Sequence, residues 1–153
     1  MNLKQQLQLI IDNAASHGVP PLVVQKAIAP TLESYARQLQ QLEYYVLQNL
    51  KADWVVTTIN NPQLQQEKRV IYAFVSVRDA AVFQGQEEEN LVAVPIAIVQ
   101  LLFRLLALSS VDSIIFLENS HNLNSGREIE RRHLSAQIEQ QLKQLSKSSP
   151  NIA

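Results

Sequence analysis

The segment Leu91–Leu108, LVAVPIAIVQLLFRLLAL, is the most apolar stretch of the chain and limits most strongly how it can fold. It reaches the minimum length of a membrane-spanning helix. Gln100 and Arg104 interrupt it one helical turn apart, and an arginine is costly in hydrocarbon. We therefore expect a core helix from Pro95 to Leu108, with the proline in its first turn. Residues 91–94 fit either a strand or a helix.

The same helix is a candidate interface. A helix that is apolar on nearly all sides needs two covering layers, and a second copy of the chain can supply one of them. We therefore expect a homo-oligomer with Leu102 and Leu105 in the contact. Gln100 and Arg104, which would form a polar stripe on the same helix, are further candidate interface residues.

The first fifty residues have the pattern of a helical hairpin. Residues 3–17 form an amphipathic helix that Gly18 can terminate in a left-handed conformation. Residues 22–50 continue the helical pattern, although Pro30 either kinks this second helix or divides it. Five residues in it alternate in steps of three and four, namely Leu32, Tyr35, Leu39, Leu42 and Val46. We expect the hairpin 1–50 to dock on the rest of the chain, because fifty residues bury too little surface to be stable alone.

The middle of the chain has the pattern of strands. Residues 54–59 and 69–77 are rich in β-branched and aromatic side chains, and the second run is apolar on both faces. Residues 80–83 either extend the second strand or form a short third one. Residues 111–117, VDSIIFL, form a further buried strand. Because a helix precedes this strand and another strand precedes that helix, we expect a parallel crossover.

These elements predict an α/β fold, with α+β as the alternative. The fold would consist of an N-terminal helical hairpin, a small mixed β-sheet of three to five strands with one β-α-β crossover, and a C-terminal amphipathic helix. At 153 residues, a single domain over 1–153 is the expectation. Its parts would be the hairpin 1–50, an α/β part over 51–147 and a frayed tail over 148–153.

The polar loop after the last strand is a candidate ligand corner. Ser125 and Glu128 have the spacing of a capping box that would start the last helix. Arg127 and Arg131 would then point the same way and could clamp a phosphate or a carboxylate. The alternative is a solvated loop with a capped helix, because Glu128 and Glu130 offset the arginine charges and no glycine-rich phosphate loop is present. The candidate binding residues are Asn119, His121, Ser125, Arg127 and Arg131.

Composition argues against several classes of function. The formal net charge of −1 and a pI near 6.3 give no field that would attract nucleic acid or an anionic membrane. The absence of cysteine excludes disulfides, thiolate metal sites, iron–sulfur clusters and cysteine nucleophiles. No two of the 3 histidines have the spacing that places both on one face of a helix. We therefore expect neither a metal nor a cofactor.

No pattern in the sequence identifies catalytic residues. Asp79 and the run Glu87–Glu89 resemble strand carboxylates that hold Mg²⁺, but the lysine expected after such a strand is missing. Ser120 and His121 are adjacent, and no serine lies in a nucleophile-elbow motif. The N-terminal segment also lacks the apolar core of a signal peptide, so we expect a cytoplasmic protein without a membrane segment.

Two hypotheses of function follow. The first is a noncatalytic cytoplasmic module that self-associates and binds another protein in a regulatory or assembly role. The alternative is a protein that binds a phosphate-containing ligand or a nucleic-acid end, with a Mg²⁺-dependent nuclease as its enzymatic form. The order of elements is generic and assigns no function by itself.

Overall fold

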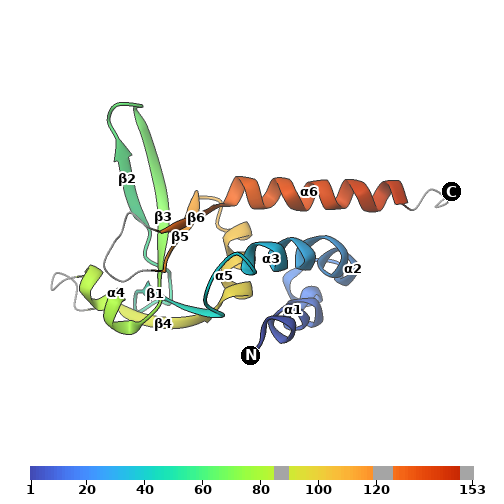
Figure 1. Ribbon diagram of the computed structural model, residues 1–153, viewed down its shortest axis with the longest axis horizontal. Coiled ribbons are helices and arrows are strands. Elements are labelled where there is room, and N and C mark those ends of the chain that lie inside the picture. The colour runs from blue at the N-terminus through green and yellow to red at the C-terminus, as the bar shows by residue number, and fades with distance from the viewer. Residues whose placement is uncertain (85–89, 119–125, 149–153) are drawn as a thin grey trace.

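The computed structural model describes residues 1–84, 90–118 and 126–148. Helices and strands alternate in the second half of the chain, whereas the first part is helical (Figure 1). The helical elements are α1 (Leu3–Asp12), the 3-10 turn η1 (Ala14–His17), α2 (Pro21–Val23), the π turn η2 (Val24–Ile28), α3 (Ala29–Ala36), α4 (Val77–Gln84), α5 (Ile98–Ala107) and α6 (Arg131–Ser148). The strands are β1 (Glu43–Gln48), β2 (Thr57–Asn61), β3 (Gln66–Phe74), β4 (Val92–Ala97), β5 (Ser113–Leu117) and β6 (Arg127–Glu130).

The described strands form one mixed sheet of six strands, so the expected range of three to five was too low. Its order is β4-β1-β3-β5-β6, and β2 pairs with the first half of β3. Strands β3 and β5 are parallel, and the other pairs are antiparallel. The chain crosses from β3 to β5 through α4, β4 and α5. The α/β class and the crossover are therefore confirmed.

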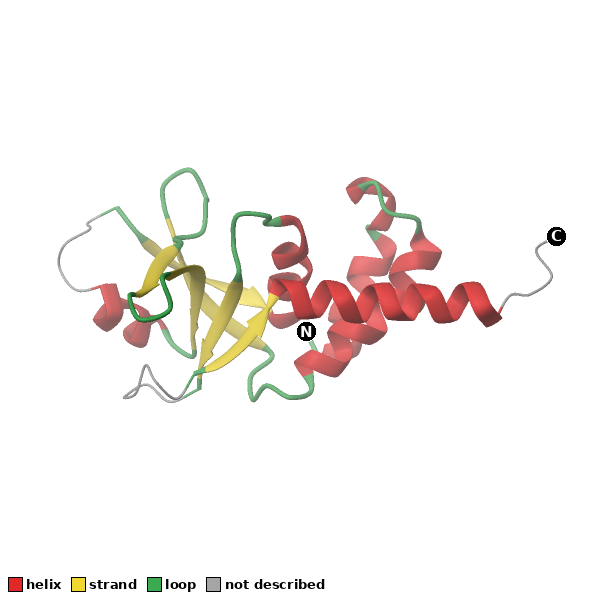
Figure 2. Ribbon diagram, turned by 90° about the horizontal axis from the view of Figure 1, so that it is seen from above, coloured by secondary structure: helices red, strands yellow, loops and turns green. Residues whose placement is uncertain are grey.

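The main core lies between one face of the sheet and the helices α1, α3, α5 and α6 (Figure 2). Side chains alternate along each strand, and those facing the helices are almost fully buried. Tyr44 of β1 and Phe116 of β5 meet edge to face here, with ring centroids 4.9 Å apart. From the helices, Leu32, Leu102 and Leu134 are fully buried in the same core.

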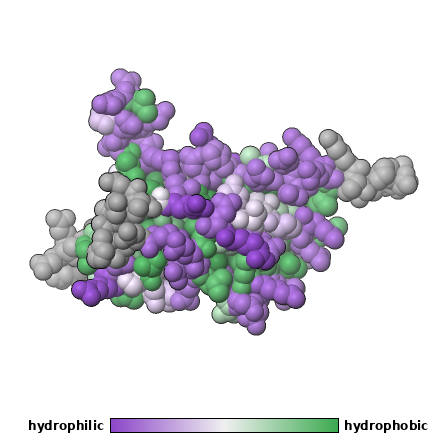
Figure 3. Space-filling view, in the orientation of Figure 1, coloured by the Kyte–Doolittle hydropathy of each residue, from purple (hydrophilic) through white to green (hydrophobic). Residues whose placement is uncertain are grey.

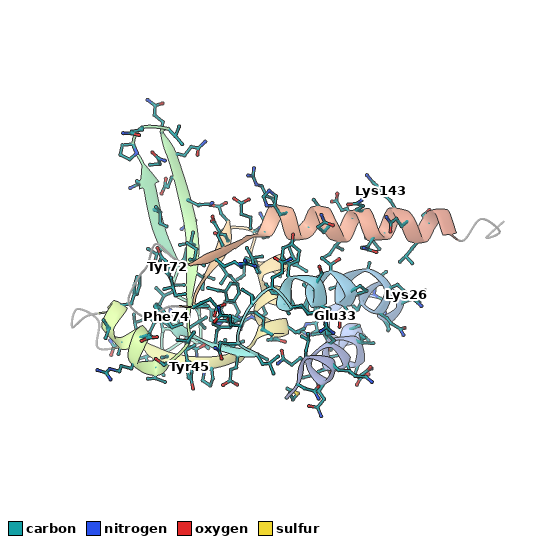
Figure 4. The ribbon with its side chains drawn as sticks, in the orientation of Figure 1. Lys26, Glu33, Tyr45, Tyr72, Phe74 and Lys143 are labelled. Carbon is teal, nitrogen blue, oxygen red and sulfur yellow. The ribbon has the colours of Figure 1, made fainter. Side chains whose placement is uncertain are left out.

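The opposite face of the sheet carries a second, smaller core under α4. Leu47, Phe74, Ala80 and Leu117 are buried there, and Tyr45 and Tyr72 are half-buried beside them (Figure 4). Gly126 also lies against this face, where an added Cβ would come within 2.5 Å of Ile115 Cγ2. Only glycine fits this close approach without displacing β5 side chains. The molecule thus has a thick helical layer on one face and a thin cover on the other.

The expectation of a helical hairpin over 1–50 was wrong in its second half. The helix that contains Pro30 runs from Pro21 to Ala36, and the π turn η2 directly precedes α3, where Pro30 lies. Such a wide turn accommodates a residue that has no N–H and a bulky ring. Residues 43–48 are strand β1, with Tyr44 and Val46 fully buried against the helices. The helical spacing continued through Val46 only by coincidence. Pairing of this segment with two neighbouring strands outweighed that pattern.

The helix predicted from Pro95 starts later, at Ile98, and Pro95 belongs to strand β4. The undecided residues 91–94 are mostly strand, because β4 begins at Val92. The N–H of Ile98 donates to the carbonyl of Leu42 at 2.9 Å, which continues the β1–β4 ladder. Since alternate residues of a strand face the neighbour, the nitrogen of Pro95 faces away from β1. A proline there costs no ladder hydrogen bond.

The remaining strand and helix predictions were partly correct. The expected strands 69–77 and 111–117 correspond to β3 and β5, and the expected strand 54–59 overlaps β2 only from Thr57. Residues 80–83 are helical and not a strand, because Ser76 Oγ accepts from the N–H of Asp79 at 3.1 Å and caps α4.

The last helix, α6, begins at Arg131, after a strand that the sequence analysis did not predict. Glu128 was expected in a capping box, but it lies in β6 opposite Ile115. Ile129 of this strand is buried and pairs with Ile114, so alternation along REIE places one apolar residue in the core. Of the expected frayed tail, Ser148 ends α6 and 149–153 lie outside the described residues.

No helix in the described ranges has both the length and the hydropathy to cross a membrane.

Candidate functional site

The expected ligand corner is not assembled by the two arginines that the structure describes. Arg127 donates from Nη1 to the carbonyl of Gln38 at 3.2 Å. Arg131 donates from Nε to the carbonyl of Val111 at 3.1 Å and from Nη2 to that of Ser109 at 3.3 Å. The two guanidinium groups thus bind backbone carbonyls of different segments and do not clamp a common anion. The other three candidates, Asn119, His121 and Ser125, lie outside the described residues, as do Ser120 and Glu87–Glu89.

The expected interface residues on α5 contribute to the chain's own fold. Leu102 and Leu105 are fully buried within a single chain, so they present no surface to a partner. Gln100 is half-buried. The guanidinium carbon of Arg104 lies 4.0 Å from the centre of the Trp54 ring. A cation–π contact of this kind explains why an otherwise apolar helix carries an arginine.

A charged network lies on the α4 side of the sheet, at the end away from α4. Lys68 Nζ of β3 lies 2.6 Å from Glu128 Oε2 and 3.1 Å from Glu130 Oε1, both on β6. It reaches them across β5, where Ser113 is small enough to let the lysine pass. Ser113 Oγ also donates to Glu128 Oε2 at 2.6 Å.

Glu130 links this network to the start of α6. Arg132 Nε and His133 Nδ1 lie 3.3 Å and 2.9 Å from Glu130 Oε2. The hydrogen bond from Lys68 holds the pKa of Glu130 below its usual value, against the effect of burial, and Arg132 acts in the same direction. Burial alone would lower the pKa of Lys68, but the hydrogen bonds to Glu128 and Glu130 raise it. Lys68 therefore stays protonated and is no nucleophile at neutral pH, while Ser113 is fully buried.

A charged cavity adjoins this network, and Lys68 and Glu130 in its wall are paired with each other. Its volume is about 390 Å³, and it opens between the first residues of β3 and the start of α6. Asp112, in its wall, accepts from the backbone N–H of Arg69 at 2.9 Å. No three His, Asp or Glu side chains of the described residues gather closely enough to hold a metal ion. The lining residues are Gln66, Glu67, Lys68, Asp112, Glu130, Arg131 and Arg132.

No family model and no curated protein sequence matches this chain. Its function therefore has to be inferred from geometry. The charged network links β3, β6 and α6, so its role is to stabilise the fold.

We expect Lys68→Met to destabilise the fold by about 1–2 kcal/mol at pH 7, because it removes the cation shared by Glu128 and Glu130 and leaves Glu130 with only its exposed partners Arg132 and His133. The pKa of Glu130 is lowered in the folded state, so its contribution is present above the unfolded pKa of about 4.3 and is lost as the pH falls through the folded value. The pKa of Lys68 is raised, so its contribution is lost only at strongly alkaline pH. The difference between the two proteins should therefore shrink at pH 3 and in high salt.

Urea unfolding at several pH values measures this effect, with Lys26→Met as the control at an exposed lysine of η2. Equal stability of wild type and Lys68→Met at neutral pH would show that the network does not contribute. A difference that stayed constant down to pH 3 would show that the lysine acts by packing and not by charge.

The outer edge of β2 is the feature of the described structure that is best placed for binding. Strands β2 and β3 form a ribbon that extends beyond the rest of the sheet (Figure 1). The carbonyl of Arg69 accepts from the N–H of Asp112 at 2.8 Å, so the backbone groups of Arg69 face away from β2. By alternation, Lys68 faces its β2 partner, Ile59. The N–H and C=O groups of Thr58 and Asn60 therefore face outward, where no described strand pairs with them.

The other two edges of the sheet are protected. The outward row of β4 contains Pro95, which has no N–H to donate. Strand β6 is short and carries Arg127, Glu128 and Glu130, which discourage a further strand. Strand β2 has neither a proline nor a charged side chain over Thr57–Asn61. Among the described strands, it alone keeps an edge that can pair.

The surface of the ribbon is mostly polar with isolated apolar side chains (Figure 3). Leu64 near the tip is 62% exposed, and Val56 at the base and Ile59 in the middle are each 37% exposed. The sequence analysis found part of this strand through its β-branched residues, but it ended the strand at Ile59. The missed signal was the uncharged run TTINN before Pro62.

Proposed function

We propose that this protein is a noncatalytic cytoplasmic module that self-associates and binds another protein. The unpaired backbone edge of β2, on a ribbon that extends from the body, carries this proposal. A two-stranded ribbon is only marginally stable by itself. Its free donors and acceptors suit it to pairing with a strand of another chain.

A second surface supports a separate protein partner. On α4, Val77 and Val82 are 53% and 74% exposed, next to the half-buried Phe83 and Tyr72. Rings of Tyr72 and Phe83 lie 4.8 Å apart between their centroids. Aromatic and aliphatic side chains of this kind are typical of the central part of protein–protein contacts. This surface lies on α4, the thin cover of the second face of the sheet, and is separate from the edge of β2.

Sedimentation velocity from low micromolar protein to the solubility limit tests the self-association. We expect the weight-average sedimentation coefficient to rise with concentration. A protein that stays monomeric throughout would contradict the proposal.

A photo-crosslinking amino acid in place of Val82 tests the second contact in the source cells. We expect a discrete adduct with one protein, and none when the crosslinker replaces Lys26 on the helical side (Figure 4). The absence of any adduct at position 82, or equal adducts at both positions, would remove the support for a partner at α4.

A further inference from the structure

We propose that two copies of this chain pair through their β2 edges, antiparallel and about a two-fold axis that passes between the two Ile59 residues. The two ribbons then form one four-stranded sheet. This inference rests on the proposed self-association and identifies both its partner and its surface.

The hydrogen-bonding groups on this edge match themselves under that symmetry. With Ile59 on the axis, Thr58 of one copy lies opposite Asn60 of the other. Both residues direct their N–H and C=O groups outward, so each such pair exchanges two hydrogen bonds across the contact. The two Ile59 residues then form a non-hydrogen-bonded pair, in which the Cα atoms are about 4.5 Å apart and side chains come close.

Charge does not oppose this pairing. All side chains of β2 are neutral over Thr57–Asn61, so two copies bring no like charges together. Lys68, the β3 partner of Ile59, is occupied by Glu128 and Glu130 of its own chain. Pro62 follows the strand directly and limits the pairing to the length of β2.

The shape of the molecule also permits the contact. An antiparallel arrangement places the tip of each ribbon beside the base of the other, so the two helical layers lie at opposite ends (Figure 1). Leu64 at the tip of one copy then approaches Val56 at the base of the other. In the single chain Val56, Ile59 and Leu64 are exposed, and this arrangement covers Ile59 with its symmetry mate.

A second copy fits this edge better than a strand of unrelated sequence. An antiparallel edge is complementary to its own two-fold image, and the β4 and β6 edges cannot compete for it because proline and charge protect them. A contact over the five residues of β2 buries less surface than the roughly 1,200–2,000 Å² that stable complexes bury, so we expect a weak dimer. Its formation should be visible only at high protein concentration.

Amide hydrogen exchange of the full-length protein, followed by NMR at low and high concentration, tests the register. We expect exchange of the Thr58 and Asn60 amides to slow as the dimer forms. The Ile59 amide bonds to β3 in either state and should not change. Self-association without slowing at Thr58 and Asn60 would overturn this inference and leave the proposed function standing, whereas a monomer at all concentrations would overturn both.

Charge substitutions at the axis provide a second test. Ile59→Glu places a carboxylate opposite Lys68 within its own ribbon, which favours the monomer fold, and opposite an identical carboxylate in the dimer. We expect the dimer dissociation constant to rise about tenfold or more, since like charges directly opposite each other repel and an apolar pair is lost. Ile59→Lys alone should also weaken the dimer, and an equimolar mixture of the two variants should restore it.

Val92→Glu is the matched control, because Val92 is a 51% exposed valine on another edge strand, β4. It should dimerise as the wild type does. Circular dichroism confirms that each variant is folded before its dissociation constant is compared. Wild-type dimerisation of Ile59→Glu, or a failure of the mixture to recover, would overturn the pairing.

Discussion

Replacing Leu102 with aspartate is expected to unfold the protein and not to release an intact subunit. Leu102 has no exposed surface within a single chain. Truncating such a leucine to alanine already costs about 2–5 kcal/mol, and a buried unpaired carboxylate costs more. That sum approaches the about 5–15 kcal/mol by which whole domains are stable. Circular dichroism should show loss of the cooperative thermal transition near room temperature.

Leu22→Asp provides the matched control, because Leu22 is 64% exposed at the start of α2. An acidic residue in the first turn of a helix is tolerated, so this variant should melt close to the wild type. A Leu102→Asp protein that remained folded and merely changed its oligomeric state would show that Leu102 lies in an interface and contradict its place in the core.

The second large effect is expected for Gln6→Leu. Gln6 is 3% exposed, and its Oε1 accepts from the N–H of Val99 at 3.0 Å, in the first turn of α5. Its Nε2 donates to the carbonyl of Leu42 at 3.0 Å. One side chain of α1 thereby caps α5 and binds the segment before β1. Leucine would leave the buried N–H of Val99 without a partner, and we expect a loss of about 2–3 kcal/mol in the free energy of unfolding.

Chemical denaturation of Gln6→Leu and Gln8→Leu separates this role from helix propensity. Gln8 lies on the same helix, is exposed and donates only to Asp12. Its replacement should change the free energy of unfolding by less than about 0.5 kcal/mol. Equal effects of the two substitutions would contradict the capping role of Gln6.

The local sequence pattern was sufficient to identify an element where contacts with distant residues did not decide its secondary structure. Alternation in 69–77 and 111–117 identified the central strands β3 and β5 because both are covered on two faces. It was insufficient for Leu42 and Val46, because residues four apart share a face in a helix and in a strand alike. The position of β1 between β3 and β4 depends on pairing with residues far away in sequence. Pro95 was misread for a similar reason, since a proline suits a first helical turn and an edge strand alike.

The expected ligand corner depended on one assumption about secondary structure. Arg127 and Arg131 share a face only if both lie on a helix, and pairing of β6 with β5 places Arg127 on a strand instead. The β-branched residues of 54–59 indicated a strand, but whether a strand is at an edge is a property of the assembled sheet. Nothing near Thr58 in the sequence indicates that β1 ends too early to cover it. The candidate binding edge therefore required the structure.

The proline in β4 also determines how far assembly can proceed. A sheet with two competent edges can add subunits at both and grow into a filament, as heterologous contacts that do not close tend to do. With Pro95 interrupting the donor row of β4, and with short length and charges protecting β6, we expect growth by strand addition to stop once two β2 strands have joined. Restoring a donor by Pro95→Val would leave the subunit fold largely intact and turn a finite particle into one able to polymerise. In the proposed dimer, the ring of Pro95 thus prevents further strand pairing through β4.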